Sequence, residues 1–292
     1  MASQIPPLLE SYLSLPPETS QVVLSGILGA STNWLVLRSL YSLLKPARGG
    51  AYSGRENEEG INDDEGDVKL LLVSFMRDFS FWRDGAGRLG LNLETLTAQG
   101  RFYFVDGLSR LFLDGTGGGA AANAGAGRGA YGHLESPRIA DVARTLGAAV
   151  AQLQAGAGAG AGRVVLVLDQ PDVLLAAAGA GDGVTGTALG ELILDLRERV
   201  HATIITVAAD EPLVSAQTTS LEKEHAAFAL SLAHGAEAVL SLRLLDTGTA
   251  KDVSGVVRIT RGGGALDRAV EEHEYLYNVG GDGGVKVFER GQ

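Results

Sequence analysis

The stretch QVVLSGILGASTNW, residues 21–34, has the pattern of a buried strand, a glycine turn and the beginning of a helix. Nucleotide-binding α/β proteins place their phosphate loop at such a junction, with the pattern G-x-x-x-x-G-K-[ST]. The glycines let backbone N–H groups face the phosphates, the lysine neutralises phosphate oxygens, and the hydroxyl holds a metal ion. This order of strand, turn and helix predicts a nucleotide-binding type of frame.

The chemical groups of a phosphate loop are missing from this stretch. Counted from Gly26, the second glycine, the lysine and the hydroxyl positions fall on Ser31, Thr32 and Asn33. A frame that begins two residues earlier restores the second glycine but places Ala30 at the lysine position. We therefore predict a degenerate pocket and no cofactor. Its residues would be Gly26, Gly29, Ser31, Thr32, Asn33 and Asp169.

Asp169 ends VVLVLD, residues 164–169, a strongly apolar strand pattern. The metal-holding acid of nucleotide-hydrolysing proteins has this position. The alternative is an acid at the end of a strand without a metal, which we favour because the loop lacks its lysine and hydroxyl. One lost charge-assisted phosphate contact costs about 1.5–3 kcal/mol, so weak nucleotide binding, or a site shared with a neighbouring subunit, stays open.

Composition limits the classes of protein that fit. The chain has 292 residues, 45% of them hydrophobic, which is enough core for one large α/β domain or two small ones. Cysteine is absent, which excludes disulfides, thiolate catalysis and cysteine-ligated zinc. No run of 18 apolar residues predicts a membrane span, and the first residues lack the basic region of a secretory signal. We expect a cytoplasmic and nuclear protein.

Charge is unevenly distributed along the chain. Residues 55–67, RENEEGINDDEGD, hold seven acids and one arginine, a net charge of −6 out of −11 for the whole chain. The remainder is only mildly acidic, so we do not expect the isolated chain to attract nucleic acid strongly. Few apolar residues occur between 46 and 67, and we expect this acidic insertion to be disordered.

Apolar patterns predict five strand–helix units followed by antiparallel strands. The expected strands are 22–25, 68–74, 102–106, 164–169 and 203–209, then 238–245, 253–260, 274–279 and 285–289. Continuous apolar runs such as KLLLV predict parallel strands that are buried on both faces. We predict one open sheet, parallel in the middle with an antiparallel C-terminal edge, in a single RecA-like α/β domain over residues 1–292. The other expected segments are an N-terminal surface arm, 1–20, and Gly/Ala-rich loops at 114–133, 155–162 and 176–187.

Three stretches narrow the fold to a family: VSFMRDFSFWRDGAGRLGLNL (73–93), LDQPDVLL (168–175) and AVLSLRLLDTGTAKDVSGVVRITRGG (238–263). They resemble the sixth subunit of the Elongator complex. The resemblance implies a RecA-like subunit without working nucleotide motifs, in a heterohexameric ring with the fourth and fifth subunits and within the larger Elongator assembly. It also implies that the ring binds tRNA and supports modification of the wobble uridine (U34). The family supplies no catalytic residues to carry over.

Arginines interleaved with aromatic residues predict a surface for RNA or for another subunit. One reading of 73–93 is stacking on RNA bases; the alternatives are a packed helix start with solvated arginines, or a subunit contact. Two further arginines flank the flexible loops and could reach the channel of a ring. The candidates are Arg77, Phe81, Trp82, Arg83, Arg88, Arg128 and Arg163.

Two functions remain from the sequence alone. The first is a non-catalytic, ring-forming subunit for RNA modification. The alternative is a divergent phosphate-loop ATPase or another nucleotide-binding enzyme that acts alone. The five histidines show no metal-ligand spacing. Turnover by the isolated chain would favour the alternative.

Overall fold

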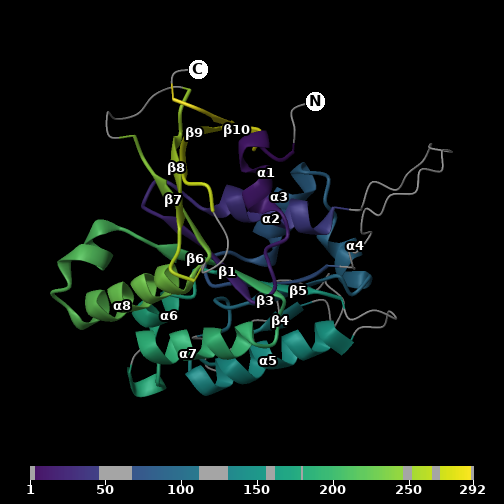
Figure 1. The fold of residues 1–292 in the computed structure, drawn as a ribbon. Coiled ribbons are helices and arrows are strands. Elements are labelled where there is room, and N and C mark those ends of the chain that lie inside the picture. The colour runs from purple at the N-terminus through teal and green to yellow at the C-terminus, as the bar shows by residue number, and fades with distance from the viewer. Residues whose placement is uncertain are drawn as a thin grey trace.

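In the part of the chain that the structure describes, ten strands form one sheet, in the order β10-β9-β8-β7-β1-β6-β5-β2-β3-β4 (Figure 1). The structure is a computed structural model, and it describes residues 4–45, 68–111, 131–155, 162–178, 180–245, 252–264 and 270–290. The expected acidic insertion, most of the loop at 114–133, nearly all of the loop at 155–162, and Arg128 lie outside these residues.

The sheet is parallel from β4 to β7 and antiparallel from β7 to β10. This confirms the predicted mostly parallel sheet with an antiparallel C-terminal edge. The strands are β1 Ser20–Gly26, β2 Lys69–Ser74, β3 Phe102–Asp106, β4 Tyr131–His133, β5 Val164–Asp169, β6 Ala202–Ala208, β7 Ala238–Arg243, β8 Gly255–Arg261, β9 His273–Val279 and β10 Val285–Phe288.

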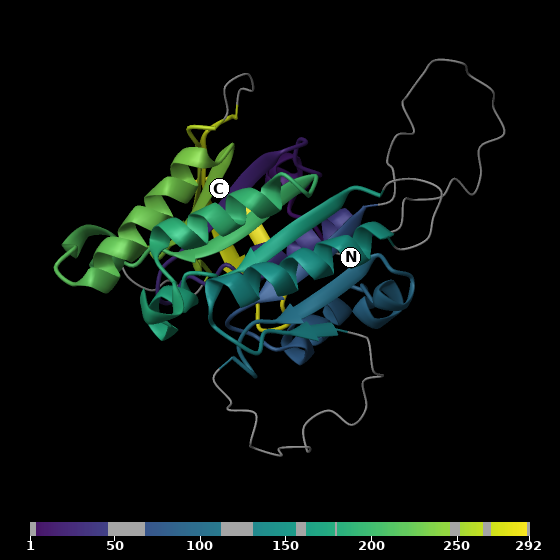
Figure 2. The ribbon, with the colours of Figure 1, turned by 90° about the horizontal axis from the view of Figure 1, so that it is seen from below.

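Helices cover both faces of the parallel part. The N-terminal half of the chain supplies η1 Pro7–Leu9, α1 Glu10–Leu13, α2 Asn33–Leu44, α3 Phe79–Arg88 and α4 Leu93–Ala98. The second half supplies α5 Ile139–Ala155, α6 Val173–Ala177, η2 Ala180–Asp182, α7 Gly186–Arg197, η3 Pro212–Ala216 and α8 Ser220–Gly235. Figure 2 shows α5, α7 and α8, coloured teal to green, side by side across one face.

Two hydrophobic clusters fill the space between the sheet and these two layers. In β2, Leu70 and Leu72 belong to the cluster under α1 to α4, while Leu71 and Val73 belong to the cluster under α5 to α8. Side chains alternate between the faces of a strand, so a strand covered on both faces must be apolar throughout. This is why the central strands are predictable from short continuous apolar runs.

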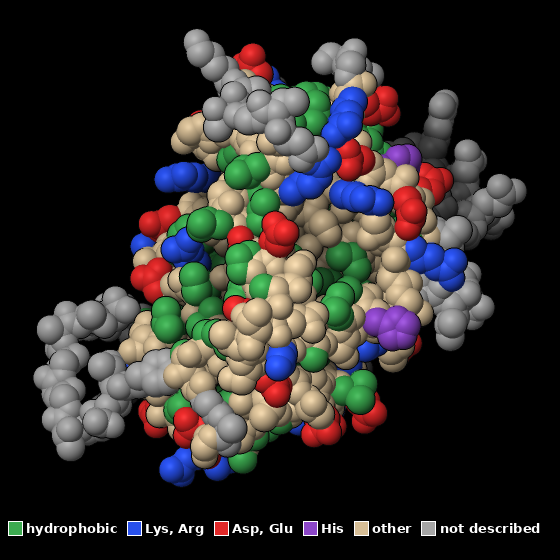
Figure 3. All heavy atoms as spheres, turned by 90° about the vertical axis from the view of Figure 1, so that its left-hand side faces the viewer, with side chains coloured by type: hydrophobic (Ala, Val, Ile, Leu, Met, Phe, Trp, Pro, Cys, Tyr) green, Lys and Arg blue, Asp and Glu red, His purple; other side chains and the backbone are tan. Residues whose placement is uncertain are grey.

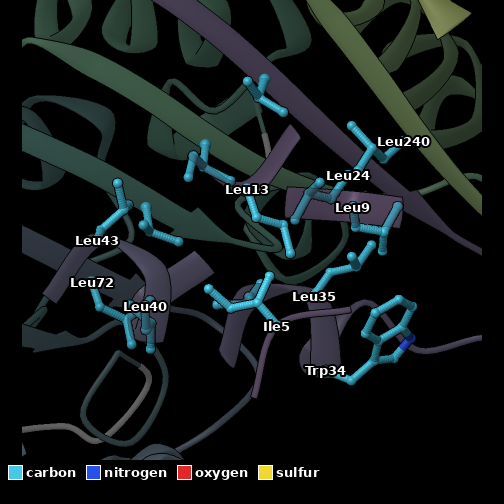
Figure 4. Packing of buried hydrophobic residues seen from close by; sticks show 14 of the residues in the cluster. Ile5, Leu9, Leu13, Leu24, Trp34, Leu35, Leu40, Leu43, Leu72 and Leu240 are labelled. Carbon is cyan, nitrogen blue, oxygen red and sulfur yellow. The ribbon is translucent and has the colours of Figure 1, made fainter. Parts of the chain in front are cut away.

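The N-terminal arm packs into the first cluster, and the prediction that it lies on the surface is wrong. Ile5, Leu9 and Leu13 are buried, and they approach core residues of β1 and α2 such as Leu24 and Leu35 (Figure 4). The hydroxyl of Tyr12 also donates to the carbonyl of Glu271, 2.8 Å away. Proline pairs flank the leucines of the arm, and they do not prevent a short helix from inserting its apolar side.

Two of the predicted Gly/Ala-rich loops are shorter than expected. Residues 131–133, inside the loop predicted at 114–133, form β4, which pairs with the last residues of β3. The loop predicted at 176–187 contains the end of α6, the 3₁₀ turn η2 and the first residues of α7. A three-residue strand and single helical turns are too short to produce a periodic signal in the sequence.

Candidate nucleotide pocket and interface residues

The predicted phosphate loop is a tight turn that closes on itself. Ile27 and Ala30 form an isolated antiparallel bridge, and the amide of Ala30 donates to the carbonyl of Ile27 at 2.9 Å. Gly29 at the tip has φ +92°, a conformation that glycine adopts without steric cost. A side chain at Gly26 would collide with the carbonyl oxygen of Ala30, since a Cβ there would lie 2.8 Å from it. The backbone therefore reverses direction within four residues.

Ser31, Thr32 and Asn33, which stand at the second-glycine, lysine and hydroxyl positions of a phosphate loop, make contacts within the turn and at the start of α2. Thr32 is buried and stands before the first residue of α2 without a side-chain cap bond, and its Cγ2 packs against Gly26. Ser31 is exposed, and its Oγ accepts the amide of Asn33 at 3.2 Å. The structure thus brings Gly26, Gly29, Ser31, Thr32 and Asn33 together in one turn. No lysine occurs before Lys45 in the chain.

A carboxylate takes the place of an anionic ligand at this turn. The amide of Leu28 donates to Oδ1 of Asp210, which follows β6, at 2.8 Å. In a phosphate loop such an amide would face a phosphate oxygen. Here it holds a side chain of the protein, whose negative charge repels a phosphate. Asp210 is 182 positions away in the sequence, so no local pattern predicted this contact.

Asp169 lies one strand away from the turn, because β6 stands between β1 and β5. Its side chain is buried, and both of its oxygens accept hydroxyl groups of neighbouring strands. Ser74 of β2 donates to Oδ2 at 2.7 Å, and Thr206 of β6 donates to Oδ1 at 3.0 Å. Burial raises the pKa of Asp169, and the two hydroxyls oppose this rise. The carboxylate therefore links β5 to the two strands beside it.

The aromatic and basic stretch after β2 divides into buried and exposed parts. Trp82 is fully buried in the core, which excludes its stacking on RNA and agrees with the alternative of a packed helix start. Phe81 is 36% exposed, and the guanidinium of Arg77 lies 5.1 Å from the centre of its ring. Arg83 pairs with acidic neighbours on α3 and α4, and Arg88 is exposed at the end of α3.

Arg163 does not join these residues. It directly precedes β5, and its carbonyl accepts the amide of Lys69 at the beginning of β2. β2 and β5 are parallel, and Arg77 lies just beyond the other end of β2. The two arginines therefore lie near opposite ends of these two neighbouring strands.

Comparisons with known proteins identify the family. The family model for Elongation complex protein 6 matches residues 65–280, well over half of the chain.

The chain belongs to the Elongation complex protein 6 family.

Among solved structures, a KaiC-like protein from the hyperthermophilic archaeon Pyrococcus horikoshii is similar, with a TM-score of 0.56 and 15% sequence identity. The alignment covers 99% of this chain and 98% of the archaeal one. This similarity confirms a RecA-like fold. No curated protein sequence matches the chain significantly.

Asp172 and His225 form a buried ionisable pair that the sequence did not predict. Oδ2 of Asp172 lies 3.9 Å from Nδ1 of His225 and accepts the amide of Ala208 at 3.3 Å. Nε2 of His225 hydrogen-bonds the carbonyl of Ala208 at 2.8 Å. Burial raises the pKa of Asp172 to about 6, although the neighbouring His225 opposes that rise. The pair joins the segment after β5 to β6 and α8.

Neither a metal cluster nor a membrane helix is present in the ranges that the structure describes. No group of three histidine or acidic side chains there is placed to hold a metal ion. None of the described helices combines the length and the hydropathy that a membrane span requires.

The side of the molecule on which α8 lies carries apolar side chains scattered among charged ones (Figure 3). Between α7 and α8 is an open cleft of about 360 Å³, whose lining includes Gly190, Leu194, Ala227 and Ser231. Most of the lining is apolar or glycine, and its charged side chains are Glu191 and Arg197 of α7.

Proposed function

We propose that this chain is a non-catalytic subunit of a heterohexameric Elongator ring that also contains the fourth and fifth subunits. In this proposal the assembled ring, within the larger Elongator assembly, binds tRNA and supports modification of the wobble uridine, in the cytoplasm and nucleus. The family match supports membership of Elongator. The similarity to a RecA-like protein supports the fold on which such a ring would be built.

One observation carries the non-catalytic part of the proposal. The amide of Leu28, at the tip of the degenerate loop, is bound to the carboxylate of Asp210. A nucleotide phosphate would have to displace that carboxylate and would then lie beside its charge. Phosphoryl transfer depends on cationic groups that stabilise the transition state, and the loop offers Thr32 where the lysine would stand.

An ATPase assay tests this. We expect the purified chain to release no phosphate from ATP above the background of a heat-denatured sample. Asp169→Ala is the control, because Asp169 is the residue that a hydrolytic mechanism would use to hold a metal ion. Phosphate release by the wild-type chain that disappears in Asp169→Ala would refute the non-catalytic reading and favour a divergent ATPase.

Assembly is tested separately. Native mass spectrometry of the chain co-expressed with the fourth and fifth subunits should detect a complex of six chains that contains all three proteins. A chain that remains monomeric in the presence of both subunits would contradict the ring, whatever the result of the ATPase assay.

A further inference from the structure

The closed turn at residues 27–30 presents an exposed leucine instead of a phosphate site. Leu28 at its tip is 86% exposed, more than any other large apolar side chain in the described ranges. Its neighbour Gly29 lies under the side chain of Leu244, with 3.3 Å between the place of a Cβ and Leu244 Cδ1. Leu244, just beyond β7, is itself 42% exposed. An apolar knob thus stands at the carboxyl ends of β1 and β7.

The knob is held in place by the protein. The bridge between Ile27 and Ala30 fixes the turn, and the bond from the Leu28 amide to Asp210 fixes its tip. A turn whose backbone is already fixed loses little backbone entropy when a partner covers it. Exposed apolar side chains that lie together mark surfaces for protein partners, and Leu28 and Leu244 lie on either side of Gly29.

Two carboxylates accompany the knob. Asp210 binds the tip of the turn, and Glu211 follows it as an exposed residue before η3. Within the described part of the chain, neither forms an ion pair. Arg243, the basic residue at the end of β7, is engaged by Glu274 at 3.3 Å. These uncompensated charges would repel a nucleic acid and attract a basic protein side chain.

We propose that this turn is a docking knob for another protein chain, which covers Leu28 with an apolar pocket and places a guanidinium or ammonium group on Asp210. In this proposal the Asp210 carboxylate does two things that a bound phosphate would do. It accepts an amide of the loop, and it offers a negative charge to the neighbouring chain. The inference rests on the proposed function, and it adds the site and the chemistry of the contact.

The docking knob is tested by measuring how tightly the full-length chain binds the fourth and fifth Elongator subunits. Fluorescence anisotropy at several salt concentrations gives the affinities. Leu28→Ala should weaken binding by about tenfold or more, as removal of a buried interface anchor does. Leu230→Ala is the matched control, because Leu230 is 55% exposed on α8, away from the turn, and it should change the affinity less than about twofold.

The charge is tested with a second matched pair. Asp210→Asn keeps an oxygen that can accept the Leu28 amide, but it removes the charge. It should weaken binding several-fold at low salt and reduce the salt dependence. Glu211→Gln removes the neighbouring charge and should have a smaller effect. Circular dichroism should show all four variants folded like the wild type.

The outcomes separate this inference from the proposed function. Wild-type binding that Leu28→Ala leaves unchanged, equal losses from Leu28→Ala and Leu230→Ala, or competition by RNA for the turn would overturn the docking knob alone. Failure of the wild-type chain to bind either subunit would overturn the proposed function, and the docking knob with it.

Discussion

Asp172 is a single residue whose ionisation opposes folding. Burial of the carboxyl raises its pKa in the folded chain to about 6, compared with an ordinary value of 3.8. Its Oδ1 has no hydrogen-bond partner among the described protein groups. As the pH rises from about 4 to 6, the unfolded chain loses this proton before the folded chain does. The folded state then binds more protons than the unfolded state, so stability falls as the pH rises.

Asp172→Asn should remove this effect. Between pH 4 and 7 the wild type should lose up to about 3 kcal/mol of its free energy of unfolding relative to the variant. Urea unfolding followed by the fluorescence of the buried Trp34 and Trp82 measures it. Asp195→Asn, an exposed position on α7, is the control and should give a curve parallel to that of the wild type. Parallel curves for Asp172→Asn as well would show that Asp172 titrates normally.

The sequence predicted individual residues well only where their partners were local. Asp169 could be placed at the carboxyl end of a buried strand, since the apolar run before it is unambiguous. Its hydroxyl partners on β2 and β6 could not be predicted, because they depend on the register between strands. The place of Trp82 stayed open for a related reason: an aromatic residue among arginines has the same local pattern whether its helix turns it inward or outward. Its burial agrees with the alternative of a packed helix start.

At the scale of elements, the N-terminal arm is expected to stabilise the fold. Leu9→Ala should lower the free energy of unfolding by about 2–5 kcal/mol, because Leu9 is fully buried between the arm and the sheet and its removal leaves a cavity. Leu8→Ala is the control, since Leu8 is only partly buried, and it should cost clearly less. Urea titration measures both. Equal stability of Leu9→Ala and the wild type would mean that the arm does not dock in solution.

Elements were predictable where burial imposes a strong pattern. The five central strands were predicted within one or two residues of their ends. The short helix α4 was missed although Asn92 caps it, because one and a half turns hold too few apolar residues to show a period.

At the scale of the whole molecule, basic groups are dispersed. Arg77 lies beyond the end of β2, and Arg163 lies at the opposite end of the neighbouring strand β5. Arg83 forms ion pairs with Asp84 and Glu94. The whole chain carries a net charge of −11. A protein that binds nucleic acid as a single chain normally presents a basic stripe, and no such stripe is formed by these candidate residues. Tight binding of tRNA would therefore require arginines from several subunits around one site.

We expect tRNA to bind the assembled ring and not the isolated chain. If the ring neutralises about 6–10 phosphates jointly, its affinity should fall by about 10³–10⁵ between roughly 50 and 200 mM salt, whereas the single chain should bind weakly with a shallow slope. Fluorescence anisotropy with labelled tRNA, for chain and ring across that range, measures both slopes. Arg77→Gln in the ring should reduce the slope by about one if Arg77 contacts a phosphate, and Arg144→Gln, at an exposed position paired with Asp141, is the control. Equal affinity and equal slope for the chain alone would mean that assembly plays no part in binding tRNA.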